Sequence, residues 1–121
     1  MASIPPSGRP PFRHRRPIYY SELSPGRKQL IREMHGIVFG RIMKLIVRGG
    51  EPVFLPRPEI EYNIRLLGHN NGPRPWHPET DFMLKAEIVA LFAEFDKFGN
   101  CLVVKLEIRG GMPYDPILRE S

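Results

Sequence analysis

The feature that most constrains the fold is a nine-residue segment that occurs twice in the chain. Residues 44–52 read KLIVRGGEP and residues 105–113 read KLEIRGGMP, so six of nine positions are identical at a constant separation of 61 residues. An apolar, helix-like stretch and a Phe-Gly pair precede each copy, at residues 39–40 and 98–99. The Gly-Gly pairs supply the positive φ that tight hairpin turns need. The chain is therefore predicted to contain two related helix–hairpin units.

Alternating side chains in both copies predict which side of each strand is buried, because strand side chains alternate with a period of two. The positions predicted to face the core are Met43, Leu45 and Val47 in the first copy, and Val104, Leu106 and Ile108 in the second. The prolines that follow, Pro52 and Pro113, lack the amide needed for a sheet ladder. The returning strands are therefore expected at sheet edges or with bulges.

Two further segments carry helix signals. Ser24-Pro25 is typical of a helix start, because Ser is a favoured N-cap and Pro has no amide to leave unpaired at the first helical position. A second amphipathic helix is predicted from Thr80 or Asp81 to about Lys97. Between the helices, residues 59–67 alternate cleanly and predict one more strand, followed by a Gly- and Pro-rich loop over residues 68–79.

The predicted order is helix, three strands, helix, strand and possibly a last strand. An alternating sheet has one solvated face, so the two helices are expected to cover the other. We therefore predict an α+β two-layer sandwich, with two helices on one face of a mainly antiparallel sheet of four or five strands, built from two helix–hairpin pseudo-repeats. Residues 22–121 are predicted to form this single domain.

Residues 1–21 are predicted to be a separate basic arm, disordered or polyproline-like. They hold five prolines and no acidic residue, a composition that cannot bury enough apolar surface to offset the entropy of ordering. The arm carries four of the five net positive charges, and the rest of the chain is polarised: residues 22–75 have a balance of +4 and residues 76–121 of −3. The basic arm and the polarised body bear on which partners the protein can attract, because charge distribution directs association rather than folding.

Arginine pairs well with phosphate, so the arm is the first candidate nucleic-acid site. Its basic residues are Arg9, Arg13, Arg15 and Arg16; those predicted on the solvated sheet face are Lys44, Arg48, Arg65, Lys105 and Arg109. The leading hypothesis is a small accessory protein that binds nucleic acid or a ribonucleoprotein through the arm. The alternative is a protein-interaction or assembly module with no nucleic-acid role. A simple solvated surface, or self-association through the sheet face, stays open.

The loop before the second helix is a candidate partner-recognition loop, with His69, Arg74, Trp76 and His77 as its recognition residues. A purely structural loop is the other interpretation. Its histidine spacing matches no zinc pattern, so we predict no metal ligands here.

No motif indicates catalysis. A nucleophile–histidine–acid pattern and a dinucleotide fingerprint are absent, although a triad need not be local in sequence, so an enzyme is disfavoured without being excluded. We predict no catalytic residue and no cofactor. A single cysteine, Cys101, cannot form an internal disulfide, and no apolar run reaches the ~20 residues of a membrane span. A cytoplasmic protein is expected, and its oligomeric state is left open.

Overall fold

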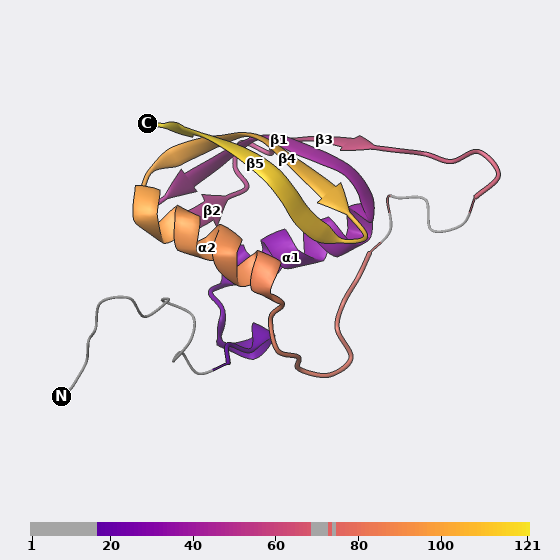
Figure 1. The fold of residues 1–121 in the computed structure, drawn as a ribbon, viewed down its shortest axis with the longest axis horizontal. Coiled ribbons are helices and arrows are strands. Elements are labelled where there is room, and N and C mark those ends of the chain that lie inside the picture. Colours follow the sequence, from indigo (N-terminus) through magenta and orange to yellow (C-terminus); the bar gives the residue numbers. More distant parts are fainter. Residues whose placement is uncertain (1–16, 69–72, 74) are drawn as a thin grey trace.

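The computed structural model describes residues 17–68, 73 and 75–121, which form two layers (Figure 1). The elements in chain order are the 3-10 helix η1 (Tyr20–Glu22), α1 (Pro25–Ile37), β1 (Phe39–Arg48), β2 (Glu51–Val53), β3 (Glu59–Tyr62), α2 (Ala86–Phe98), β4 (Cys101–Arg109) and β5 (Met112–Glu120). All strand pairs are antiparallel, and α1 and α2 lie on the same side of the sheet. The predicted α+β two-layer architecture is confirmed.

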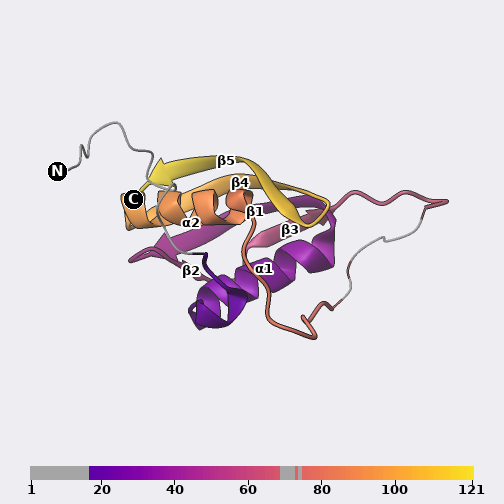
Figure 2. The same cartoon turned by 60° about the horizontal axis from the view of Figure 1, so that its bottom comes forward.

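The centre of the sheet is the pairing of β1 with β4 (Figure 2). Their register runs from Phe39 opposite Arg109 to Val47 opposite Cys101. The short β2 and the long β5 flank this pair, giving the order β2-β1-β4-β5, and β3 pairs with the first half of β1. The strands that contain Pro52 and Pro113 therefore lie at the edges, where a missing amide costs least.

The core lies between the helices and the central strands. Its helical members are Leu30, Ile31, Met34 and Ile37 of α1 and Ile88, Leu91, Phe92 and Phe95 of α2. Its strand members include Ile42, Leu45, Val47, Val103, Leu106 and Ile108. The strand positions carry β-branched and leucine side chains that fit a pleated, half-buried surface, while the apolar stripe of each helix turns toward them.

The predicted inward positions are right for Leu45, Val47, Leu106 and Ile108 but wrong for Met43 and Val104, which lie outside the core. Ile42 and Val103 take their places, each with 0% exposure. Irregular backbone explains both shifts. Lys44 has a φ of +61°, and the β4–β5 register slips between Val103 and Lys105. A bulge moves the alternation by one residue, which a strict period of two cannot anticipate.

The second helix begins at Ala86, not at Thr80 or Asp81 as predicted. The Asp81 carboxylate instead accepts hydrogen bonds from the amide and hydroxyl of Ser21, at 2.9 and 2.6 Å. Backbone bonds from Tyr20 N to Phe82 O and from Leu84 N to Ile18 O hold the next residues extended. This pairing satisfies amides that a longer helix would otherwise use, so tertiary contacts override the local cap signal.

The predicted strand over residues 59–67 is correct only for its first four residues, because β3 ends at Tyr62. The amide of Asn63 still donates to the carbonyl of Phe39, at 2.9 Å. Phe39 is the first residue of β1, so the partner strand ends there and the ladder stops with it. Leu66, which lies within the predicted strand, is 91% exposed.

The two hairpin turns have the same backbone. φ is +58° and +79° at Gly49 and Gly50, and +58° and +80° at Gly110 and Gly111. Each turn is tied to the end of the other unit's helix. The amide of Gly50 donates to Gly99 O at 2.7 Å, and that of Gly111 donates to Val38 O at 2.9 Å.

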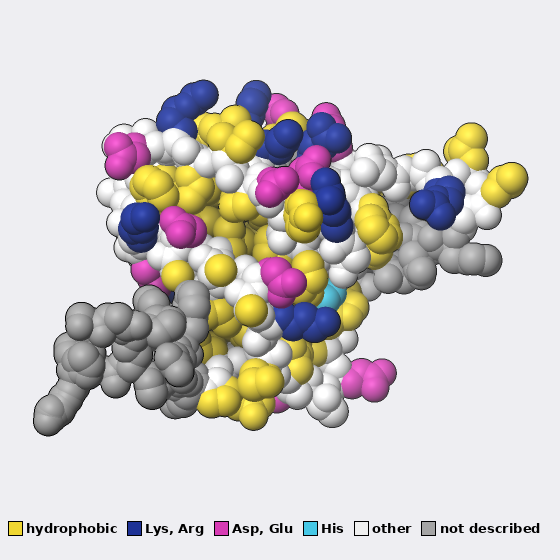
Figure 3. All heavy atoms as spheres, in the orientation of Figure 1, with side chains coloured by type: hydrophobic (Ala, Val, Ile, Leu, Met, Phe, Trp, Pro, Cys, Tyr) yellow, Lys and Arg dark blue, Asp and Glu magenta, His cyan; other side chains and the backbone are white. Residues whose placement is uncertain are grey.

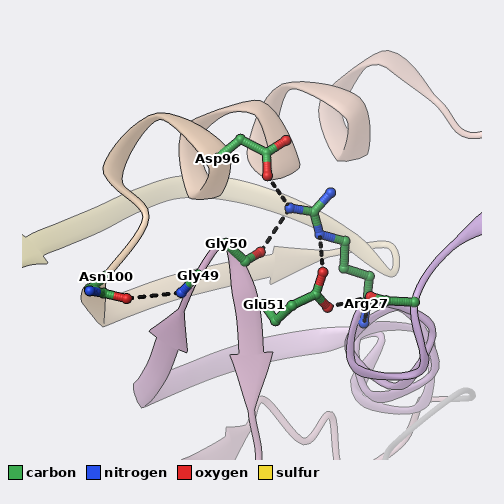
Figure 4. A network of polar contacts seen from close by, with 7 residues as sticks. Arg27, Gly49, Gly50, Glu51, Asp96 and Asn100 are labelled. Carbon is green, nitrogen blue, oxygen red and sulfur yellow. Dashed lines mark hydrogen bonds and ion pairs between the residues drawn. The ribbon is translucent and has the colours of Figure 1, made fainter.

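Arg27 of α1 reinforces the first of these turns (Figure 4). Its Nη2 donates to Gly50 O at 2.8 Å and to the Asp96 carboxylate at 2.6 Å, and its Nε lies 3.8 Å from Glu51. The guanidinium also lies over the Phe92 ring, 4.9 Å from its centroid. One mostly buried arginine thus joins α1, α2 and the β1–β2 hairpin, because its donors fan out in a fixed plane.

We expect Gly50→Ala and Gly111→Ala to destabilise the fold more than Gly49→Ala and Gly110→Ala. All four positions have positive φ, which costs an L-residue roughly 1–2 kcal/mol. A Cβ at Gly50 or Gly111 would in addition come within 2.8 Å of Asp96 Oδ1 or His35 Nδ1, whereas no atom lies within 4 Å at the other two. Urea unfolding of the four variants measures the ranking. Equal destabilisation at all four would show that the helix contacts do not constrain the turns.

Candidate interaction surface

The side of the sheet that faces away from α1 and α2, here called the open face, is covered by no other described element (Figures 1 and 2). Residues directly opposite one another on paired strands point to the same side, so the register orders this face into rows. One row is Val53, Ile46, Leu102 and Arg119; the next is Glu59, Met43, Lys105 and Ile117; the third is Glu61, Arg41, Glu107 and Tyr114.

An apolar row, defined as Val53, Ile46 and Leu102, runs across three neighbouring strands of the open face. All three side chains are partly exposed, and none belongs to the buried core or packs against it. Ile117 of the second row is 50% exposed. Cross-strand aliphatic pairs stabilise a sheet, but their outer surface stays in water unless something covers it.

Two of the five cations predicted on the sheet face, Lys44 and Arg109, are held by acids. Lys44 Nζ lies 3.0 Å from the Glu59 carboxylate, and Arg109 Nη2 lies 2.9 Å from Glu107. Arg109 also stacks on the ring of Tyr114, 4.0 Å from its centroid. These exposed pairs contribute little stability, but they cancel positive charge that a phosphate backbone would need. Along the upper rim of Figure 3, Lys and Arg side chains accordingly alternate with Asp and Glu.

The remaining sheet-face cations fall into two groups. Arg48 and Lys105 form no ion pair with any described residue, and neither does Arg119, which alternation within the predicted strands did not indicate. Arg65 lies beyond the end of β3, outside the paired strands. The structure therefore brings Arg48 and Lys105 together with Arg119 around the apolar row and leaves Arg65 apart. The arm residues Arg9, Arg13, Arg15 and Arg16 lie outside the described residues.

The residue missed most clearly is Leu102, with its neighbour Ile46. The alternation that placed Lys44 and Arg48 outward also placed Ile46 outward, so that signal was present. No such sequence signal indicated Leu102 or Arg119, because their position on the open face depends on which strands become neighbours and in what register. Strand order is a tertiary property that residue patterns within one strand do not contain.

Trp76, predicted as the anchor of a recognition loop, is packed against the body. Its indole stacks on the His35 ring with 4.1 Å between centroids and meets Phe82 edge-on at 5.9 Å. Phe82 in turn stacks on Tyr20 at 5.1 Å, so this aromatic chain fixes the segments before η1 and α2 to the core. His77 is exposed next to it. The other recognition residues, His69 and Arg74, lie outside the described residues.

A cavity of about 470 Å³ is lined by residues of both this loop and α1. Its lining includes Trp76, His77, Arg32 and Tyr62, together with Glu33 and Arg57, which pair with each other at 3.3 Å. Arg32 Nη1 donates to the Tyr20 hydroxyl at 2.9 Å. Three charged side chains of this lining, Arg32, Glu33 and Arg57, are therefore already engaged by protein groups. Within the described ranges, no three His, Cys, Asp or Glu side chains gather closely enough to hold a metal ion.

His35 is the half-buried ionisable group at this junction. Burial lowers its pKa, and the positive charge of Lys85 lowers it further. Both causes favour the neutral ring, because a charged imidazolium loses hydration here and meets a like charge. In the folded protein, the His35 ring that stacks on Trp76 is therefore favoured in its neutral form.

Comparisons with known proteins found no match to this chain among protein-family models, curated proteins or solved structures. Separately, neither α1 nor α2 has the length and apolar character that a membrane-spanning helix requires.

The pKa of His35 makes a prediction about pH. In the unfolded chain a histidine titrates near 6.5, above the lowered folded value, so below that pH the unfolded state binds more protons. The contribution of the neutral ring to the free energy of unfolding is fully present above about pH 6.5. It is lost as the pH falls toward and through the pKa of His35 in the folded state. The stability difference between the wild type and His35→Gln, measured by urea unfolding, should shrink from pH 7.5 to pH 5. A difference that is flat with pH, or one matched by His77→Gln at the exposed imidazole, would contradict this.

Proposed function

We propose that the protein is a protein-interaction module that docks an acidic partner on the open face of its sheet. The observation that supports this most is the apolar row Val53, Ile46 and Leu102, which lies outside the core on a face that no described element covers. Interfaces place such apolar groups at the centre and polar groups at the rim. The open face has this arrangement.

The charges around the apolar row favour an acidic partner over a second copy. Arg48, Lys105 and Arg119 flank the row without an acid of their own among the described residues. A two-fold contact between copies would bring these like charges together, which costs free energy. Carboxylates on the partner would instead neutralise them. The aliphatic character of the row also argues against nucleic acid here, because bases stack on aromatic side chains.

The test is a pair of matched substitutions. Leu102→Asp places a charge in the apolar row, whereas Leu67→Asp changes a leucine that is 99% exposed and lies beyond the end of β3. Each full-length variant is immobilised and exposed to nuclease-treated lysate. We expect acidic proteins to be captured by the wild type and by Leu67→Asp, and Leu102→Asp to reduce their capture roughly tenfold or more, equivalent to about 1.4 kcal/mol. Circular dichroism controls for folding. Equal capture by both variants, or capture of basic proteins only, would contradict the proposal.

Nucleic-acid binding through the arm is the second candidate, supported by the charge pattern. The arm holds Arg9, Arg13, Arg15 and Arg16 with no acid, while ion pairs cancel several of the sheet cations. Any affinity for a phosphate backbone should therefore reside in the arm.

Deleting residues 1–16 should reduce binding to a single-stranded DNA of fixed length strongly. The slope of the logarithm of the binding constant against the logarithm of the salt concentration should also become shallower, by about 0.7 for each phosphate that the protein no longer neutralises. The body should stay folded, because the core of the described residues begins at Tyr20, beyond the deletion. Full-length and truncated proteins are compared in a fluorescence anisotropy titration at several salt concentrations. If both bind equally, the arm is not the site; if neither binds at low salt, this candidate function fails.

We further infer that the two helix–hairpin units are related to each other. α1 begins at residue 25 and α2 at residue 86, 61 residues apart, and both have 13 residues. The bonds Gly50–Gly99 and Gly111–Val38 are separated by the same interval. The same ranking of the glycine variants in both hairpins would support this relation, and a helix-contact penalty in only one hairpin would count against it. A cytoplasmic location is part of the proposal, supported by the lone free thiol of Cys101.

A further inference from the structure

A groove between α2 and β5 has no role in the proposed function. Its cavity of about 430 Å³ is lined by the apolar groups of Ala90, Pro113 and Pro116 and by the carboxylates of Glu87, Glu94 and Asp115. Among the described residues, no lysine or arginine lines it. None of these three carboxylates forms an ion pair with a described residue. The groove is thus apolar in its middle and acidic at its borders, and its charge is not compensated locally.

We propose that this groove binds residues 9–13 of the same chain. These residues read Arg-Pro-Pro-Phe-Arg, with an apolar centre and a cation at each end. That order is complementary to the groove in both polarity and charge. Consecutive prolines favour the polyproline II conformation, and such segments dock into apolar grooves with little further loss of conformational entropy.

The spacing of the charges matches. Glu87 and Glu94 are seven residues apart on α2, about 10.5 Å at 1.5 Å per helical residue. Arg9 and Arg13 are four residues apart, about 12 Å at 3.1 Å per residue in polyproline II. One arginine can therefore meet each glutamate while Pro10, Pro11 and Phe12 cover the apolar middle. Arginine is suited to this role, since its guanidinium pairs bidentately with a carboxylate.

The arm also starts close enough to reach the groove. Ile18 bonds to Leu84 just before α2 and lines a small cavity with Val89 and Ala93 on one side of that helix. The groove lies along another side of the same helix, at Ala90 and Glu94. The path from Ile18 around α2 to the groove is comparable to a helix diameter of about 10–12 Å. Residues 14–17 span up to roughly 13 Å when extended, so residue 13 arrives at the groove border.

Docking of the arm would compete with a phosphate backbone for the same arginines. The groove then acts as an internal acidic competitor, and nucleic acid must displace it. This consequence rests on the arm's proposed nucleic-acid function, whereas docking itself does not. Neutralising the groove should therefore strengthen binding of single-stranded DNA by the full-length chain.

Paramagnetic relaxation tests the docking directly. A nitroxide is attached at Ser7→Cys in the full-length protein, where the native Cys101 is buried and burial raises the pKa of its thiol, so that it does not compete for the label. At low salt we expect the label to broaden the amide signals of Ala90, Glu94 and Asp115 but not those of Ile46 and Leu102 on the open face. High salt should remove the broadening, because the contact is between exposed charges.

Matched variants separate the proposed contact from general attraction. Arg9→Gln with Arg13→Gln should abolish the broadening, and Arg15→Gln with Arg16→Gln, the same charge change in the same arm, should preserve it. Glu87→Gln with Glu94→Gln should abolish it, and Glu79→Gln with Glu120→Gln should not. Charge reversal at both partners, E87R/E94R with R9E/R13E, should restore it.

Three results would overturn the inference. One is the absence of groove broadening at low salt, and another is broadening that survives Glu87→Gln with Glu94→Gln. The third is broadening seen only when isotope-labelled and nitroxide-labelled chains are mixed, because the arm would then dock on a second copy. A chain that docks its arm but does not bind single-stranded DNA would overturn the proposed arm function alone.

Discussion

The antiparallel pairing of β1 with β4 is the constraint on which the rest of the structure depends. These two strands come from opposite halves of the chain and are the only ones in the described residues with a paired neighbour on both sides. Each continues through a Gly-Gly turn into an edge strand, and each turn is hydrogen-bonded to the end of the other half's helix. Neither half can therefore close its own hairpin contacts alone. The arrangement places both helices on one side and leaves the open face on the other (Figure 1).

A two-layer fold with a single core has consequences for function. The helices supply the apolar surface that buries one side of the sheet, and nothing in the described chain does so for the other. The apolar row between Arg48, Lys105 and Arg119 remains on that side. Around the helical layer, by contrast, five of the eight acids of residues 76–121 lie on α2 or β5, away from the basic arm in sequence. The charge polarity of the chain thus becomes two surfaces of different character, one suited to an acidic partner and one to a basic segment.

Sequence patterns predicted helix starts and turns correctly where a residue interacts with the backbone close to it in sequence. Ser24 caps α1 by accepting the Arg27 amide, and the Gly-Gly turns adopt the positive φ expected of them. The failures all involve distant partners. The alternation of β1 changes at Lys44, which has a positive φ, so that Met43 lies outside the core; Ser21 holds Asp81 away from a helix cap, and β3 ends where β1 begins. The candidate surface was predicted only in part for the same reason. Lys105 and Arg48 were found from alternation, but their lack of an ion pair with a described acid and the position of the neighbouring Leu102 depend on strand order.

Site-specific photocrosslinking measures the central claim, that the open face is where a protein partner binds. A benzoylphenylalanine is introduced in cells at Leu102 on the open face or, as the comparison, at Lys97, an exposed residue of α2 in the opposite layer. We predict a nuclease-resistant adduct with an acidic protein from position 102 and none from position 97. Equal adducts from both positions, or an adduct from position 102 that nuclease removes, would contradict it.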